Sequence, residues 1–73
     1  MIEVRLFATF RDGREKIYHL PPEEHHTGED IVRYLGIEND EVAIFLINGL
    51  HSKLPDAVKD GDVIALFPPV GGG

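Results

Sequence analysis

The chain has 73 residues, enough for one domain with a single small core. It contains no cysteine, which excludes disulfide bridges, thiolate metal sites and cysteine nucleophiles and agrees with a cytoplasmic protein. The net charge of −6 argues against a nucleic-acid partner. No apolar stretch approaches the roughly 20 residues that a membrane-spanning helix needs, so we expect no membrane association.

The N-terminal segment predicts a β-hairpin. Apolar and polar residues alternate over residues 2–6, which indicates a half-buried strand. Asp12-Gly13 is a turn signal, and residues 15–20 form the expected return strand. Pro21-Pro22 ends this second strand.

One short helix is expected near residues 28–35. Thr27 stands three residues before Asp30, a weaker relative of the capping box that starts many helices. Apolar residues then follow at helical spacing. Gly36 occupies the position of a C-terminal capping glycine, and Ile37 is placed for the hydrophobic contact that accompanies such a cap.

The C-terminal half predicts further strands. Residues 42–47 are apolar on both faces, as in a central strand. Asn48-Gly49 is a strong hairpin signal, after which residues 50–53 form a short strand. A tight turn over residues 59–62 leads into the last strand, residues 62–67.

This order of elements predicts an α+β fold of the β-grasp, ubiquitin-like type. One main helix would pack on one face of a mixed sheet of four or five strands. In that fold type the first and last strands are adjacent and parallel at the centre of the sheet. We therefore expect a β-grasp domain over residues 1–67 and a flexible tail over residues 68–73.

The tail, Pro68-Pro69-Val70-Gly71-Gly72-Gly73, is the most informative segment. The two prolines stiffen the exit from the last strand, whereas three glycines contribute almost nothing to a core. Such a strip of backbone, with a carboxylate at its tip, can enter a narrow enzyme cleft that side chains would block. The alternative is an ordinary frayed terminus.

Catalytic and metal sites are not indicated. His51 and Ser52 are adjacent on an extended segment, so their side chains point to opposite faces. His25 and His26, next to two glutamates, could bind a metal ion, but exposed loop histidines are the more frequent case. We expect no metal, no bound cofactor and no catalytic residue of the chain's own.

A partner surface is indicated on the sheet face without a helix. If Ile64 and Leu66 face the helix, their neighbours in the last strand face away from it. Apolar side chains that gather on an uncovered face commonly mark a binding surface. The candidate residues are Phe7, Phe45, Val63, Phe67, Pro68, Pro69 and Val70.

The final strand, the Asp60-Gly61-Asp62 turn before it and the ending Phe-Pro-Pro-Val before the glycines resemble the ubiquitin-like sulfur carriers of the MoaD/ThiS type. The small subunit of molybdopterin synthase is the most similar member, and residues 4–8 also resemble its opening strand. The small subunits of molybdopterin synthase usually carry a small residue such as alanine before the final two glycines, where this chain has Gly71.

This resemblance implies a function for the tail. A ubiquitin-activating-like enzyme would use ATP to adenylate the carboxylate of Gly73, and a sulfur donor enzyme would convert it into a thiocarboxylate. Gly71, Gly72 and Gly73 would then insert into the large subunit of molybdopterin synthase. The alternatives are a sulfur carrier for thiamine or another cofactor, a modifier conjugated to lysines, and a plain interaction module that docks by its sheet face.

Overall fold

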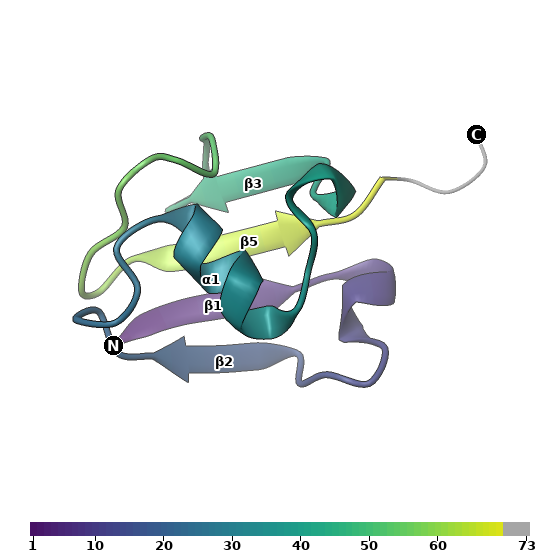
Figure 1. Cartoon of the computed structure of the whole chain (residues 1–73), viewed down its shortest axis with the longest axis horizontal. Coiled ribbons are helices and arrows are strands. Elements are labelled where there is room, and N and C mark those ends of the chain that lie inside the picture. The colour runs from purple at the N-terminus through teal and green to yellow at the C-terminus, as the bar shows by residue number, and fades with distance from the viewer. Residues whose placement is uncertain (70–73) are drawn as a thin grey trace.

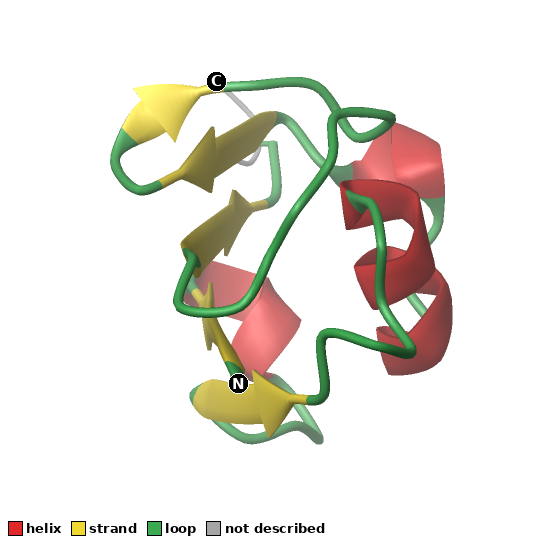
Figure 2. Cartoon of the chain, turned by 90° about the vertical axis from the view of Figure 1, so that its left-hand side faces the viewer, coloured by secondary structure: helices red, strands yellow, loops and turns green. Residues whose placement is uncertain are grey.

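A mixed sheet forms one layer of the molecule, and an α-helix packs across one of its faces (Figures 1 and 2). The computed structural model describes residues 1–69. In chain order the elements are β1 (Ile2–Leu6), the 3₁₀ turn η1 (Ala8–Arg11), β2 (Ile17–Leu20), α1 (Gly28–Leu35), the 3₁₀ turn η2 (Asn39–Glu41), β3 (Ile44–Ile47), β4 (Leu50–His51) and β5 (Val63–Phe67). The strand order β2-β1-β5-β3-β4 confirms the β-grasp fold.

The first and last strands pair in parallel at the centre of the sheet, as the fold type predicts. Val4 lies opposite Ile64, and Leu6 lies opposite Leu66. All four side chains are fully buried beneath α1. Burying a side chain of this size contributes about 1.5–3 kcal/mol, so this pairing supplies much of the core.

The helix begins and ends where the sequence predicts. The Thr27 hydroxyl accepts a hydrogen bond from the Asp30 amide, and the Asp30 carboxylate accepts bonds from the amides of His26 and Thr27. At the other end Gly36 takes the left-handed conformation (φ 75°), and the Ile37 amide donates to the Val32 carbonyl. The helix is therefore capped at both ends by its own sequence.

The core lies between α1 and the sheet and includes one residue that we expected outside it. The ring of Phe45 packs against the start of α1, and a Cβ added to Gly28 would lie 2.5 Å from its Cζ atom. Phe45 is 4% exposed and lies opposite Leu66, a core residue of β5. Its placement on the uncovered face is therefore wrong. Residues 42–47 are apolar on both faces, so their alternation could not decide which face is inside.

The remaining differences concern lengths and turns. The strands β2, β3 and β4 are shorter than predicted, and the sequence analysis did not predict η1 or η2. The chain turns sharply after β1, where Ala8 has a positive φ of 53°. In the part of the chain that the model describes, the helices are too short or too polar to cross a bilayer.

The cap of α1 predicts a pH dependence of stability. Hydrogen bonds from the His26 amide, followed by the Thr27 amide and Arg33, hold the pKa of Asp30 below its ordinary value of 3.8. A carboxyl with a lowered pKa stabilises the fold above its unfolded pKa, and this contribution is lost as the pH falls through the folded pKa.

We expect Asp30→Asn to lower the free energy of unfolding at neutral pH. The difference from the wild type should shrink below pH 3.8, measured by urea denaturation across the acid range. Other carboxylates titrate in both proteins and cancel in this difference. Glu24→Gln, a change to an exposed carboxylate with no ion pair among the described residues, is the control. A gap between Asp30→Asn and the wild type that stays constant on acidification would contradict the interpretation.

Candidate functional site

The sheet face opposite α1 carries a patch of apolar side chains, here called the open face. It comprises Phe7, Ile44, Leu46, Val63, Ala65 and Phe67. The register brings them together, because Ile44 lies opposite Phe67 and Leu46 lies opposite Ala65. Alternate residues of β3 and β5 thus fill the core, and those between them form the patch.

Polar residues border the open face on the side of β1 and β2. Glu3 forms an ion pair with Arg5, and its carboxylate lies 3.5 Å from the Nε2 atom of His19. The hydrogen bond from Arg5 is the main reason why the pKa of Glu3 lies below its usual range. An apolar centre with a polar rim is the usual anatomy of a protein–protein interface.

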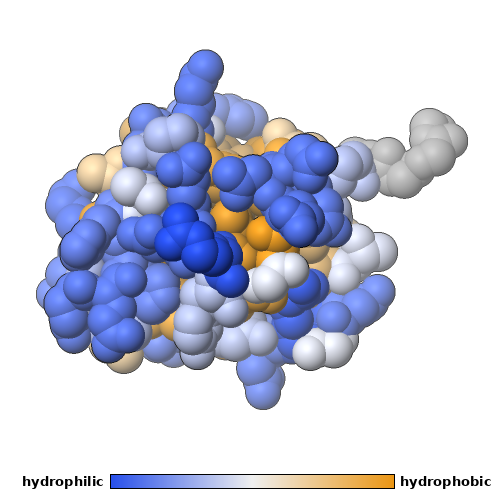
Figure 3. Space-filling model, viewed as in Figure 1, coloured by the Kyte–Doolittle hydropathy of each residue, from blue (hydrophilic) through white to orange (hydrophobic). Residues whose placement is uncertain are grey.

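The helix side differs from the open face in character. Figure 3 shows it covered mainly by hydrophilic residues, with hydrophobic residues visible in a gap near its middle. Acidic residues outnumber basic ones in α1 and η2, which carry Glu29, Asp30, Asp40 and Glu41 against one base, Arg33. A docking partner that needs an apolar surface would therefore meet it on the open face.

Two stacked rings hold the end of β5 beside the end of β1. The rings of Phe7 and Phe67 lie 4.4 Å apart between centroids and 8° from parallel. The Arg11 guanidinium lies 5.2 Å from the centroid of the Phe7 ring, and its Nε donates to the Leu6 carbonyl at 2.7 Å. Because η1 turns back after Ala8, Arg11 reaches the ring of Phe7.

The root of the tail is fixed by the sheet. The Phe7 amide donates to the Leu66 carbonyl, and the Ala43 amide donates to the Phe67 carbonyl. Pro68, half-buried, and Pro69, exposed, continue from this fixed point. With η1 and η2 they border a cleft of about 510 Å³ lined by Thr9, Phe10, Arg14, Asp40, Glu41, Pro68 and Pro69. The tail therefore leaves the domain between these two 3₁₀ turns (Figure 1).

The structure brings together part of the predicted partner surface. Phe7, Val63 and Phe67 lie on the open face, and the two prolines adjoin it at the end of β5. Phe45 does not belong to it, as described above. Val70, Gly71, Gly72 and Gly73 lie outside the described residues.

Several open-face residues were missed by the sequence analysis. Ile44 and Leu46 replace Phe45 in the patch, and the antiparallel register with β5 was the information needed to find them. Arg11 gave no signal, because its approach to Phe7 depends on η1.

One of the two loop histidines, His25, is buried, contrary to the expectation of exposed side chains. His25 is 5% exposed; its Nδ1 lies 3.1 Å from the Pro21 carbonyl, and its ring meets Tyr34 edge-on. His26 is exposed, as expected. Among residues 1–69, no three histidine or carboxylate side chains are placed to hold a metal ion together.

The central parallel strands, the single helix across the sheet and the strand that ends at the tail root define a ubiquitin-like protein of the β-grasp type. The sequence matches the ThiS family over residues 4–73, and the chain belongs to this family. It is thus one of the small ubiquitin-like carriers and modifiers.

Known relatives include both carriers and modifiers. Small archaeal modifier protein 3 of Haloferax volcanii is 33% identical, with 99% of this chain and 98% of the relative covered. The crystal structure of small archaeal modifier protein 1 from the same organism superposes with a TM-score of 0.73 at 27% identity, over 94% of this chain and 97% of the other. A chain from the complex of subunits 1 and 2 of the molybdopterin-converting factor from Helicobacter pylori superposes with a TM-score of 0.64 at 27% identity. The match covers 99% of this chain and 97% of the other.

The stack between Phe7 and Phe67 can be tested by a double-mutant cycle. We expect Phe7→Leu and Phe67→Leu together to cost less than the sum of the single changes, with a coupling energy of about 0.5–1.5 kcal/mol in urea unfolding. The control pairs Phe67→Leu with Tyr34→Leu on the other side of the sheet, which should be additive within about 0.5 kcal/mol. Additivity of the two phenylalanine changes would show that the stack does not hold the tail root.

Proposed function

We propose that this chain is a sulfur carrier protein that donates sulfur in molybdopterin biosynthesis as the small subunit of molybdopterin synthase. The observation that carries this proposal is the end of β5 directly before Pro68-Pro69 and the glycines, where the Leu66 carbonyl accepts from the Phe7 amide and the Phe67 carbonyl accepts from the Ala43 amide. Membership of the ThiS family and the likeness to the molybdopterin-converting factor support it.

In the proposed reaction the chain is a protein co-substrate. A carboxylate is a poor electrophile, so an oxygen of the Gly73 carboxylate first attacks the α-phosphate of ATP and pyrophosphate leaves. Hydrosulfide delivered by a donor enzyme then attacks the acyl carbon, the bond from that carbon to the AMP oxygen breaks, and AMP leaves; loss of the sulfur proton gives the thiocarboxylate. The catalytic residues for both steps would belong to the partners, in keeping with a chain whose relatives are carriers and modifiers.

The open face and the tail would act together. The six residues from Pro68 span at most about 20 Å, which lets the glycines reach a buried active site while the domain stays outside. Docking through the open face would aim the tail, because Phe67 belongs both to the patch and to the tail root. The partners would be an adenylating enzyme and, for sulfur transfer, a large subunit of molybdopterin synthase.

A modifier conjugated to lysines is the second candidate. The relative named small archaeal modifier protein 3 favours it, since the match covers nearly all of both chains. Both functions need the same activated Gly73, so the two candidates differ in the final acceptor. A sulfur carrier for another cofactor remains compatible with the same tail.

We expect the intact mass to increase by the replacement of one oxygen by sulfur, localised to Gly73, after incubation with ATP, an activating enzyme and a sulfur donor. Deleting Gly73 or adding a residue after it should abolish the change, because the reacting carboxylate is then misplaced. A change that survives the untrimmed extension would contradict the proposal. Lysine adducts carrying a Gly-Gly-Gly remnant in cell extracts would identify the modifier.

A charge on the open face should prevent activation without unfolding the domain. Ile44, 36% exposed, lies in the patch, so Ile44→Asp should lower the rate of adenylation strongly by placing a carboxylate in an apolar interface. Leu50→Asp makes the same change at a residue that is 71% exposed and outside the patch, and it should react normally. Pyrophosphate release measures both rates. Equal rates would show that docking does not use the open face.

A further inference from the structure

Arg11 lies beside the open face in a fixed orientation. Its guanidinium carbon is 5.2 Å from the centroid of the Phe7 ring, and its Nε atom donates to the Leu6 carbonyl at 2.7 Å. The remaining N–H donors, on the two terminal nitrogens, form no hydrogen bond or ion pair within residues 1–69. A planar pair of donors of this kind matches the two oxygens of a carboxylate.

Arg11 gives one end of the open face a positive charge. Arg5, on the same side of the sheet, pairs with Glu3, so those two charges balance. Asp12, the next residue after Arg11, lines a groove beside Tyr34 on the helix side. The whole chain has a net charge of −6. The cation at the open face therefore has the opposite sign to the protein that carries it.

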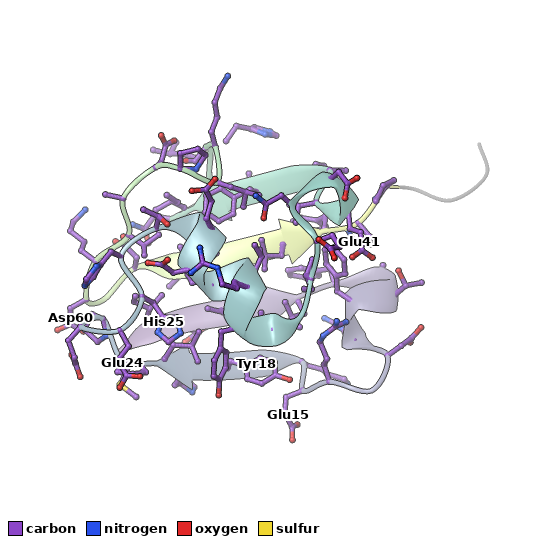
Figure 4. All side chains as sticks on the ribbon, viewed as in Figure 1. Glu15, Tyr18, Glu24, His25, Glu41 and Asp60 are labelled. Atoms are coloured by element: carbon purple, nitrogen blue, oxygen red, sulfur yellow. The ribbon has the colours of Figure 1, made fainter. Side chains whose placement is uncertain are left out.

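The two sides of the tail root differ in charge. Asp40 and Glu41 line the cleft beside Pro68 on the η2 side, and Figure 4 shows Glu41 next to the exit of the tail. Arg11 belongs to η1 and lies over the ring of Phe7. A protein docked on the open face thus meets a cation at η1 and carboxylates beyond the tail root, so charge complementarity favours a carboxylate of the partner opposite Arg11.

We propose that the Arg11 guanidinium binds an aspartate or glutamate side chain of the adenylating enzyme when that enzyme docks on the open face. This inference rests on the proposed function. Arg11 is then a specificity-determining residue. An enzyme with an apolar docking surface but no carboxylate at this point leaves the cation unpaired beside the interface, and an enzyme with a base there is repelled.

A phosphate group of ATP is a poorer occupant because of distance. ATP has to meet the carboxylate of Gly73, whereas Arg11 lies at the root of the tail, over the ring that stacks on Phe67. The six residues from Pro68 span up to about 20 Å when extended into an active site. Arg11 therefore contributes to docking and not to the chemical step, so its replacement should change the KM for the chain and leave kcat near the wild-type value.

The test measures KM and kcat for the chain by pyrophosphate release, with ATP, a sulfur donor and the adenylating enzyme that converts the wild type. Arg11→Ala should raise KM about tenfold and leave kcat within about twofold. Arg11→Glu should raise KM further, because it brings two carboxylates together. Lys53→Ala and Lys53→Glu make the same charge changes at an exposed base after β4. At about 0.15 M salt, which screens distant charges, both controls should react as the wild type does.

Salt dependence separates a charge contact from a structural role of the same side chain. The advantage of the wild type over Arg11→Ala should shrink between about 0.05 and 0.5 M salt, because screening weakens an ion pair. Equal KM values for Arg11→Ala and Arg11→Glu, independent of salt, would reveal lost packing on Phe7 and overturn the proposal. If Arg11→Ala does not fold, Arg11→Gln replaces it with the same expectation, since it keeps most of the stem over Phe7.

The proposed function and this inference fail in different ways. A wild type that no adenylating enzyme converts overturns both. A wild type that is converted, with KM unchanged in Arg11→Ala, overturns this inference alone, and so does a lower kcat at unchanged KM. A lower KM for Arg11→Ala also overturns it, because the guanidinium would then bind the terminal carboxylate of its own chain in competition with the enzyme.

Discussion

The parallel pairing of β1 and β5 is the constraint on which the rest of the structure depends. It brings the first and last strands together, so the residues that precede each strand lie side by side. The Met1 ammonium pairs with Asp60, and the Gly61 amide donates to the Met1 carbonyl. The bond from the N-terminal ammonium is the main reason why the pKa of Asp60 is lowered. The helix and hairpins then have to pack around a pair of strands that are distant in sequence.

The same pairing determines where the tail leaves the domain. Parallel strands end at the same edge of a sheet, which places Phe7 directly beside Phe67. The amide of Phe7, directly after β1, and the amide of Ala43, directly before β3, donate to the carbonyls of Leu66 and Phe67 at the end of β5. The position of the tail root is thus a property of the sheet.

Local signals in the sequence were sufficient for α1 and for the succession of strands along the chain, whereas their neighbours in the sheet were inferred from the fold type. The helix is bounded by Thr27 and Gly36, whose capping bonds involve neighbours in sequence, so no tertiary information was needed. The orientation of β3 was different, because all of Ile44–Ile47 is apolar and only its register with β5 places Phe45 inside. The burial of His25 and the approach of Arg11 to Phe7 likewise depend on turns that carry no periodic pattern.

The distribution of charge separates the surfaces that the fold creates. Carboxylates gather on the helix side, whereas Ile44, Leu46 and Ala65 leave the middle of the open face without charge. The repulsion between acidic helix sides disfavours nonspecific association, and an apolar face of this kind can remain exposed on a protein that exchanges partners. A carrier must bind one enzyme, leave it and bind the next. For the proposed carrier function, weak docking by a small apolar face would meet that requirement better than a large and permanent interface.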